Sequence, residues 1–526
     1  MRSIGGRIAL SAVLLVAAGL LTASCGGSGK AAASPVCTTV TMNVAPAAAG
    51  SGSWAYSNAD LANRRDATGS TISSANVAGL ARAWTFKLTG KAATGVSPYG
   101  SLTANPIVQR GVVYLQDLDS NVYALSLATG KLDWEYRCDQ PEKSGPGPNG
   151  VAVAGGKVYG LTPTTAFAVS AATGRRVWVK SDLLHAGEGT FGIQPQVAGG
   201  RVYLASQYGS GPGGGVLLAL NASSGAELWR FNTVTGPEPG VKALGLGAGG
   251  AWETPLVGSD GSVTYGIGNP YQTPAAAIAH PARDLYTDSD VNLDAATGKL
   301  RWYYQGVPDD FKDWDMQTSP ISARIRGVSV VIGSGKMGDV YEMNASTGKL
   351  IWKAPVGAHN GHDSDSLLAF EHRSTLKPPL TILPGSFGGV LTDLAVADDS
   401  VYVATLDLPL TYPTFNLPAA TKPAGSATGE VEALSLATGR VEWDRKLPQF
   451  PLGGVTVSND LVFTTLYDGE LMALERTTGA IVYRHRLPTS ANSPIAIAGN
   501  AVIVPAGGPE TKTGHGDPQV VAYRVP

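Results

Sequence analysis

The chain has 526 residues, of which 67 are Gly and 34 are Pro, whereas only 15% are charged and the formal net charge at pH 7 is −2. A net charge so close to zero excludes a basic nucleic-acid-binding surface and an acidic tail, so nucleic acid is not expected as a partner. The abundant Gly and Pro predict many turns, and the length alone would ordinarily indicate several domains.

The first 24 residues have the composition of an export signal. Arg2 and Arg7 supply positive charge, and the apolar run from Ile8 to Leu21 is too short to span a bilayer comfortably. Small residues then precede Cys25, which is similar to the lipobox of bacterial lipoproteins, although the Leu of that motif stands one place earlier here. We expect residues 1–24 to be a lipoprotein-type signal peptide and Cys25 to be lipidated. The alternative is an ordinary signal peptide followed by an incidental Cys.

A lipid on Cys25 would be the only membrane contact of the exported protein, at the outer face of the cell membrane or in the periplasm. The composition of residues 25–52 predicts a flexible linker behind this anchor. Cys37 and Cys138 are a disulfide candidate in an oxidising compartment, and the bond would tie this segment to the first repeat. Neither lies in a CxxCH motif, so no c-type haem is expected, and no run after residue 24 is expected to cross a membrane.

From residue 53 onward the dominant signal is a repeat of strand-like runs. In the first copy, GVVYLQD at Gly111–Asp117 is followed by NVYALSL at Asn121–Leu127, a tight ATG turn and KLDW. A large aromatic residue four places after the turn Gly recurs along the chain, at Trp134, Trp178, Trp229, Trp302, Trp352, Trp443 and Tyr483.

Alternating Val, Tyr and Leu predict half-buried strands, and the turn Gly can take the positive φ that a hairpin needs. One unit cannot bury both of its faces, so the units must stack around a ring with an aromatic packed between neighbouring sheets. ARAWTFKL at Ala81–Leu88 could supply the outer strand that the last unit lacks. The sequence therefore predicts an all-β propeller of about eight blades over residues 53–526, closed by both termini.

One stretch in the middle of the chain concentrates residues suited to chemistry. Trp252 lies in AWETP, Asn269 lies in a Gly-flanked turn, Asp313 and Asp315 form an Asp-x-Asp pair, and Lys336 lies in GSGKMG. Strand-like runs separate these motifs, so we expect the ends of neighbouring blades to bring them into one site.

The repeat YALxxxTGKxxW resembles that of the quinoprotein alcohol dehydrogenases, which depend on pyrroloquinoline quinone (PQQ), and the resemblance covers most of the chain after residue 50. The entry segment YSNADLANRR with LARAWTF, and the late stretch Pro451–Gly479, are similar to the same family. Repeats of this kind also occur in non-catalytic propellers such as outer-membrane assembly lipoproteins, so the site residues must separate the two possibilities.

The resemblance implies a role for each site residue. Trp252 would form the floor beneath the flat quinone, and Lys336 would contact the quinone oxygens and stabilise the reduced, anionic cofactor. Asn269, Asp313 and Asp315 would bind Ca²⁺ or a lanthanide, and Asp313 would also be the base that takes the alcohol proton. The alternatives to these roles are that Trp252 is a core residue, that Asn269 caps a turn, that Asp313 and Asp315 belong to an acidic surface loop, and that Lys336 is solvated.

The sequence departs from the family in three places. The segment that carries the family's metal-binding Glu reads SQYGSGPGGG, where Gln207 or Ser210 offers an oxygen without charge. The adjacent Cys pair above the quinone is absent from Ser144–Val153, and Lys312 precedes the base where the family has Trp. The loss of a charged ligand predicts weaker metal binding.

A second group of metal-ligand residue types lies in GAHNGHDSD at Gly357–Asp365. It contains His359, His362, Asp363 and Asp365. His and carboxylate suit several divalent ions, whereas the alternative is a solvated loop.

Two functions from different classes follow. The leading hypothesis is an exported PQQ-dependent dehydrogenase that oxidises an alcohol or polyol and passes electrons to a separate acceptor such as a cytochrome, because no haem-binding segment is recognised. The alternative is a non-catalytic propeller that serves as a cell-envelope scaffold or binding lipoprotein. No nucleotide-binding fingerprint is present, so NAD is not expected.

Overall fold

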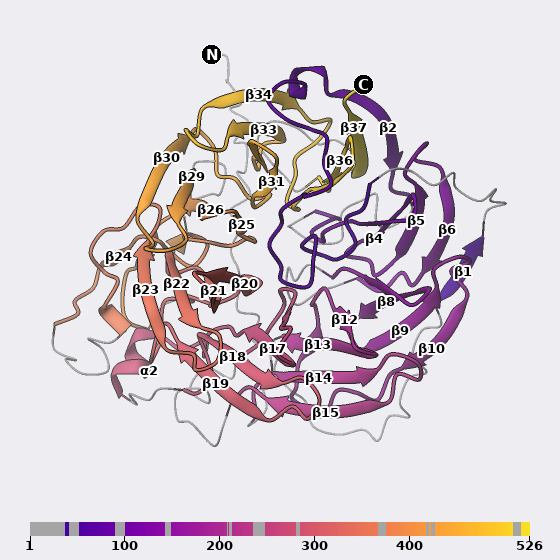
Figure 1. Ribbon diagram of the computed structural model, residues 1–526. Helices are drawn as coiled ribbons and strands as arrows, with labels where there is room; N and C mark the ends of the chain where they lie inside the picture. Colours follow the sequence, from indigo (N-terminus) through magenta and orange to yellow (C-terminus); the bar gives the residue numbers. More distant parts are fainter. Residues whose placement is uncertain are drawn as a thin grey trace, which may run out of the picture.

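A computed structural model shows the chain as a ring of eight antiparallel blades around a central axis (Figure 1). It describes residues 37–41, 52–89, 100–141, 149–207, 209, 213–234, 248–279, 284–366, 375–416, 420–421, 427–508 and 517–526. The first strand of each blade lies at the axis and the last lies at the rim, and first strands of neighbouring blades contact one another. The predicted eight-bladed propeller is confirmed.

The first four blades follow the chain from the axis outward. Blade 1 has β3 (Ile107–Gln109), β4 (Val112–Gln116), β5 (Val122–Ser126) and β6 (Leu132–Arg137), and blade 2 has β7 (Ala152–Ala154), β8 (Lys157–Thr162), β9 (Thr165–Ser170) and β10 (Arg176–Lys180). Blade 3 has β12 (Gln196–Ala198), β13 (Arg201–Gln207), β14 (Val216–Asn221) and β15 (Glu227–Asn232), with the short β11 (Thr190–Phe191) also pairing with β13. Blade 4 has β16 (Leu256–Val257), β17 (Ser262–Gly266), β18 (Ser289–Asp294) and β19 (Leu300–Gln305).

The remaining blades complete the ring. Blade 5 has β20 (Ile321–Ile325), β21 (Val328–Ser334), β22 (Asp339–Asn344) and β23 (Leu350–Pro355), and blade 6 has β25 (Ala395–Ala397), β26 (Ser400–Asp407), β29 (Thr428–Ser435) and β30 (Val441–Leu447). Blade 7 has β31 (Thr456–Ser458), β32 (Leu461–Thr465), β33 (Glu470–Glu475) and β34 (Ile481–Arg486). Blade 8 has β35 (Ala496–Ala498), β36 (Ala501–Ala506), β37 (Gln519–Arg524) and, at its rim, β2 (Ala81–Lys87).

Both termini therefore close the ring, because β2 from the start of the chain pairs antiparallel with β37 from its end. Trp84 of β2 takes the place of the missing repeat aromatic. Its indole Nε1 donates to the carbonyl of Leu127 at 2.7 Å, and its ring covers Gly130 in the turn between β5 and β6 of blade 1. The segment Ala81–Leu88 thus fulfils the role predicted for it.

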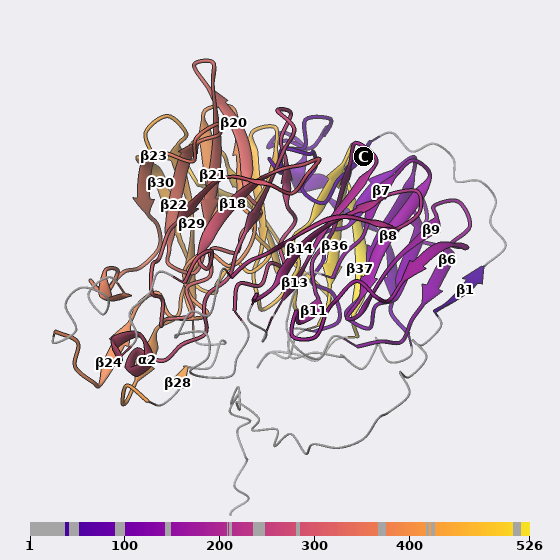
Figure 2. The ribbon, with the colours of Figure 1, turned by 90° about the horizontal axis from the view of Figure 1, so that it is seen from below.

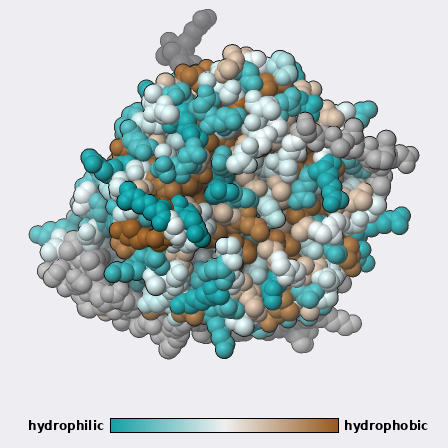
Figure 3. Space-filling view, in the orientation of Figure 1, coloured by the Kyte–Doolittle hydropathy of each residue, from teal (hydrophilic) through white to brown (hydrophobic). Residues whose placement is uncertain are grey.

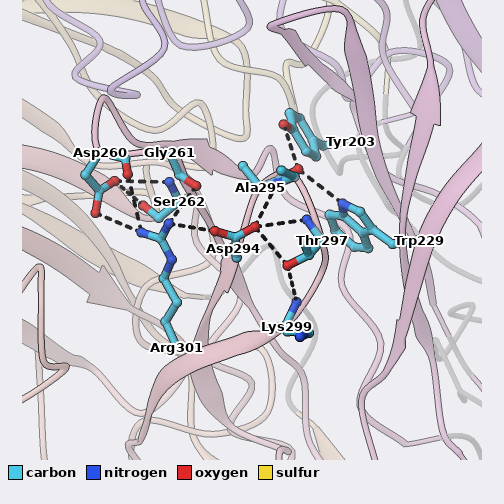
Figure 4. A network of polar contacts seen from close by, with 11 residues as sticks. Tyr203, Trp229, Asp260, Gly261, Ser262, Asp294, Ala295, Thr297, Lys299 and Arg301 are labelled. Atoms are coloured by element: carbon cyan, nitrogen blue, oxygen red, sulfur yellow. Dashed lines mark hydrogen bonds and ion pairs between the residues drawn. The ribbon is translucent and has the colours of Figure 1, made fainter.

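Each repeat Trp donates a hydrogen bond from its indole to the next blade, as Figure 4 shows between blades 3 and 4. The indole Nε1 of Trp229 donates to the Ala295 carbonyl at 3.1 Å, and the Tyr203 hydroxyl donates to the same oxygen at 3.3 Å. Gly298 has φ +70°, and a Cβ there would lie 2.7 Å from the Trp229 ring. Gly is needed both for the turn and for the close approach of the indole.

Residues 54–80 cross the axis before the first blade begins, and they end in the short 3-10 helix η1 (Val77–Gly79). This segment binds first strands on several sides of the ring, with backbone hydrogen bonds from Trp54 to Val108, Ser322 to Ala62, Val396 to Arg64 and Val457 to Arg65. The indigo trace in Figure 1 runs through the centre accordingly. On the same face, hydrophilic and hydrophobic side chains are interspersed (Figure 3).

Residues 37–41, which belong to the expected linker, include a strand. β1 (Thr38–Thr41) pairs antiparallel with the rim strand β6, and Cys37 forms a disulfide with Cys138 just beyond that strand. Residues 1–24 and Cys25 lie outside the described residues. Within the described part of the chain, no helix is both long and apolar enough to cross a membrane.

Insertions between strands build a small accessory layer at one end of the ring, which Figure 2 shows on one side of the blades. It contains α2 (Pro274–Ala279) and a sheet of β24 (Leu380–Ile382), β27 (Leu410–Tyr412) and β28 (Ala420–Thr421). Apolar side chains from α2, β24 and β27 pack together with Phe311, and the Tyr412 hydroxyl donates to the Phe311 carbonyl at 2.5 Å. The layer therefore supports the loop that carries Asp313.

Candidate functional site

The ends of blades 4 and 5 deliver the five predicted site residues to one place. Trp252 precedes β16 and Asn269 follows β17, so the antiparallel pairing puts both at the same end of blade 4. Asp313 and Asp315 lie in the connection from β19 to β20, and Lys336 lies in the turn between β21 and β22. The separate motifs are thus brought together across strands, as expected from the sequence.

Gly268 lies where the end of blade 4 contacts the segment that carries Asp315. Its N–H donates to the Gly250 carbonyl at 2.7 Å, which draws the turn before Asn269 against the segment that carries Trp252. A Cβ at position 268 would lie 2.8 Å from Cη2 of Trp252 and 2.7 Å from Oδ1 of Asp315. The bare backbone therefore lets a half-buried indole and a buried carboxylate lie side by side.

A charged cluster stands beside the indole. The ammonium of Lys336 is 3.1 Å from Oδ2 of Asp313 and forms a second, closer ion pair with Asp315. Asn269 holds both carboxylates, because its backbone N–H donates to Asp315 Oδ1 at 2.8 Å and its Nδ2 donates to Asp313 Oδ1 at 2.6 Å. Asp315 and Lys336 are buried, whereas the Asp313 side chain is 29% exposed. Asp313 is therefore the carboxylate that a substrate can reach.

The environment of Asp313 suits a base that works near neutral pH. Burial raises its pKa to about 7, with Lys336 opposing the rise and Asp315 adding to it. Its φ is +61°, a left-handed conformation that costs a non-Gly residue about 1–2 kcal/mol. Such strain is characteristic of positions where the orientation of a side chain matters more than local stability.

The donor set fits a hard cation. The Oδ1 of Asn269 is buried without a hydrogen-bond partner, and so are both amide atoms of Gln207 at the end of β13. The backbone of Ser206, next to Gln207, accepts a hydrogen bond of 3.0 Å from Ala251, which places this strand end beside Trp252. Amide and carboxylate oxygens are the ligands that Ca²⁺ and related ions prefer. Ser210, the other oxygen considered from the sequence, lies outside the described residues.

Lys312, which replaces the family's Trp, has a role away from the cluster. Its ammonium lies 3.3 Å from the ring centroid of Trp314 and donates to the carbonyl of His362 at 3.0 Å. Burial lowers the pKa of Lys312 to about 8, while Asp310 opposes that change. Lys312 therefore anchors the loop at residues 357–365 and leaves Asp313 in place.

The His and Asp residues of that loop are paired with one another and do not converge on one point. His359 Nδ1 contacts Asp363, and His362 Nδ1 contacts Oδ2 of Asp365 at 2.7 Å. Across the described residues, the sole group of three or more His, Cys, Asp or Glu side chains close enough to share an ion is Glu430, Glu432 and Asp444, on blade 6. The alternative metal site at residues 357–365 is not supported.

Several charged residues at the axis were not predicted from the sequence as part of the site. Glu253 directly follows Trp252, and burial together with Asp393 raises its pKa well above the ordinary range, while Arg65 opposes the rise. All five N–H groups of Arg65 are used by neutral acceptors, namely Val455, Asn58, Asn105, Thr456 and Ile495. Glu253 was visible in AWETP and Arg65 in LANRR, but neither motif shows that the charge of Arg65 acts on Glu253 in the folded chain.

Comparison with known proteins agrees with this geometry. The model of the PQQ family, described as the β-propeller domain of glucose/ethanol/alcohol dehydrogenases, matches residues 54–154 and 193–358. The chain belongs to the PQQ alcohol dehydrogenase family. A second model, described as the outer membrane protein assembly factor BamB, matches residues 427–523.

Curated family members are distant relatives. The quinohemoprotein alcohol dehydrogenase ADH-IIG of Pseudomonas putida is 28% identical over 337 residues, which cover 57% of this chain and 45% of that protein. The chain spans about half the length of the first curated relatives that it matches.

Solved structures of the family share the fold. The quinohemoprotein alcohol dehydrogenase of Comamonas testosteroni superposes with a TM-score of 0.74 at 22% identity, covering 90% of this chain and 80% of that one. A europium-containing methanol dehydrogenase superposes with a TM-score of 0.73 at 18% identity, covering 90% of this chain and 98% of that one. At these identities the likeness establishes the propeller and no more.

Proposed function

We propose that the protein is a PQQ-dependent dehydrogenase that oxidises an alcohol, with Asp313 as the catalytic base. The observation that carries the proposal is the cluster at the ends of blades 4 and 5. There a strained, partly exposed carboxylate is held by Asn269 and Lys336 beside a half-buried indole. A purely structural propeller has no need of such an arrangement, since buried ion pairs contribute little to stability.

The residues would share the work as follows. Trp252 would support the flat cofactor, and Asn269, Asp313 and Asp315, with Gln207, would hold a Ca²⁺ or lanthanide ion. The chemistry that such a quinone supplies is acceptance of the hydride from the carbinol carbon. Asp313 would take the hydroxyl proton, so that the alcohol leaves as an aldehyde or ketone. Lys336 would supply positive charge opposite the oxygens that become electron-rich.

The proposal also covers where the protein is located and which kind of molecule accepts its electrons. Export with a lipid on Cys25 would place the protein at the outer face of the membrane or in the periplasm, where a separate acceptor such as a cytochrome would collect the electrons. The names of the quinohemoprotein relatives support an electron-transfer partner of the cytochrome type.

A non-catalytic envelope protein is the second candidate, and two observations favour it. Gln207 lies where the resemblance places a carboxylate ligand, and residues 427–523 match the assembly-factor model. Dye-linked oxidation of ethanol, 1-hexanol, benzyl alcohol and glycerol, after loading with PQQ and either Ca²⁺ or La³⁺, separates the candidates. Asp313→Asn should reduce turnover about 10²- to 10⁴-fold. The control is Asp290→Asn, which removes a buried carboxylate whose pKa is raised by burial alone.

A further inference from the structure

Blade 6 carries three carboxylates that are separate from the cluster around Asp313. Glu430 and Glu432 lie on β29, the third strand from the axis, and Asp444 lies on the rim strand β30. Each of these three side chains, called here the blade 6 carboxylates, has an oxygen within 4.8 Å of the other two. Glu430 and Glu432 are buried and Asp444 is exposed, so solvent reaches them from the rim.

The repeat itself does not require acidic residues at these places. Glu432 and Asp444 lie directly opposite each other across β29 and β30. Counted from the turn Gly of each repeat, the corresponding pairs in blades 7 and 5 contain a basic residue and no acid, namely Met472 with Arg484 and Tyr341 with Lys353. Blade 6 therefore has a third carboxylate where its two neighbours have a cation.

A buried hydroxyl group points toward the same carboxylates. Thr405 of β26 pairs directly with Glu430, so both side chains lie on one face of the sheet. The Thr405 Oγ1 is buried and has no hydrogen-bond partner among the described residues. A Cβ at Gly357 would lie 3.0 Å from this oxygen, and the Gly357 N–H donates to Oε1 of Glu432 at 2.6 Å. Since burial of an unpaired hydroxyl costs free energy, this oxygen lacks a ligand that the described residues do not supply.

The negative charge of the blade 6 carboxylates is only partly balanced. Lys446 contacts Glu430 and lies 3.1 Å from Oδ2 of Asp444, so one ammonium stands among three carboxylates. The Lys446 side chain is 68% exposed, so it can turn out into solvent. Burial raises the pKa of Glu432 to about 7, and the charges of Glu430 and Asp444 add to that rise. A divalent cation would supply the positive charge that these groups lack.

We propose that the blade 6 carboxylates and the hydroxyl of Thr405 bind a Ca²⁺ ion on the side of the blade that faces Gly357. Oxygens on opposite sides of Ca²⁺ are about 4.6–5.2 Å apart, so three oxygens within 4.8 Å of one another can share one ion. These ligands are all oxygens, without His or Cys, which favours Ca²⁺ over Zn²⁺. Water completes the coordination from the exposed side. Without the ion, the Lys446 ammonium takes its place.

The ion would also fix the loop behind the proposed base. Gly357 begins the loop of residues 357–365, whose carbonyls anchor Lys312. A Ca²⁺ ion on the Glu432 carboxylate would hold the acceptor of the Gly357 N–H, and with it the start of this loop. Hydrogen exchange in the loop should therefore slow when Ca²⁺ is added to the wild type and stay the same when it is added to Asp444→Asn. Equal slowing in both proteins would contradict this link.

Equilibrium dialysis of Ca²⁺ against the full folded chain without PQQ tests the site directly. Asp444→Asn, an exposed change that keeps the shape of the side chain, should weaken the blade 6 site about tenfold or more. Asp313→Asn should leave it unchanged, which separates this ion from the cation of the proposed dehydrogenase. Glu470→Gln is the matched control for Glu430→Gln, because it removes the acid at the same place in blade 7, beside Arg484. Equal Ca²⁺ binding by the wild type and Asp444→Asn, or equal losses in Glu430→Gln and Glu470→Gln, would overturn the proposal.

Lys446→Gln gives an independent test, since it removes the ammonium that competes with the ion. Its affinity for Ca²⁺ should rise about fivefold or more. In thermal melts at equal Ca²⁺ concentration, the rise in Tm should be larger for Lys446→Gln than for the wild type, and smaller for Asp444→Asn. An affinity that stays the same or falls in Lys446→Gln would show that the carboxylates are built for the ammonium and not for a metal ion, and would overturn the proposal.

Discussion

Replacing Gly174 by Ala should weaken the contact between blades 1 and 2, and the structure allows the cost to be estimated. Gly174 has φ +65°, and a Cβ there would lie 2.7 Å from Cε3 of Trp134. The left-handed conformation costs an L-residue about 1–2 kcal/mol, and forcing a methyl group into a packed interface costs about 1–3 kcal/mol more. Trp134 cannot easily move aside, because it is buried and its Nε1 donates to the Ala171 carbonyl at 3.0 Å.

Gly156 in the same blade provides the matched control. It has φ +72°, but a Cβ there would meet nothing within 4 Å. Gly156→Ala should therefore carry only the conformational cost of about 1–2 kcal/mol. Urea unfolding of both variants, followed by Trp fluorescence and far-UV circular dichroism, measures the difference directly. We expect Gly174→Ala to lose about 1–3 kcal/mol more than Gly156→Ala.

The double variant Trp134→Ala/Gly174→Ala isolates the interface. Once the indole is absent, Ala at position 174 should cost no more than Ala at position 156, which gives a coupling energy of about 1–3 kcal/mol. Equal losses for Gly174→Ala and Gly156→Ala, or a coupling energy near zero, would refute the view that the repeat Gly exists to admit the neighbouring blade's Trp.

Three further predictions follow from the site and the N-terminal segment. Burial raises the pKa of Asp313 to about 7 from its ordinary 3.8, so between these pH values the folded, unloaded protein keeps a proton that the unfolded chain loses. The free energy of unfolding should therefore fall as pH rises from 3.8 to about 7. Urea titrations at several pH values measure this slope, and Asp313→Asn should flatten it. Burial opposes the charged form of His359, but Asp363 outweighs burial and raises the His359 pKa. The contact between His359 and Asp363 should therefore weaken as pH rises through that pKa, and hydrogen exchange in residues 356–366 should increase. Asp363→Asn should show the faster exchange already below pH 6.5. Cys138→Ser should lower the free energy of unfolding by about 2–5 kcal/mol in thermal or urea melts, and reductant should do the same to the wild type but not to the variant.

The fold was largely predictable because its rules are local and repeated. Alternation with a period of two residues marks the strands, and the turn Gly with its following aromatic marks each blade. Even the closing strand was visible, since Trp84 continues the aromatic series that otherwise ends at Tyr483. Residues 37–41 were not recognised as a strand, because their pairing with β6 depends on a partner almost a hundred positions away.

The sequence predicted that the five residues would lie together, but it did not predict the contacts among them. The Asp-x-Asp motif indicated a shared direction, but nothing local shows that Lys336 pairs with both carboxylates or that Asn269 joins them. Lys312 resembled a defect in the motif until its contact with Trp314 gave it a separate role.

Equilibrium binding of PQQ to the folded chain tests the central claim most directly. The protein would be titrated with PQQ in the presence of Ca²⁺ or La³⁺, and the quinone absorbance and Trp fluorescence would be followed for the wild type and for Trp252→Ala. The account predicts saturable binding of one PQQ per chain that depends on the cation and weakens at least tenfold in Trp252→Ala, which corresponds to about 1.4 kcal/mol or more of lost stacking. No saturable binding under any cation condition would contradict the dehydrogenase assignment and leave a propeller whose site residues no longer serve a cofactor.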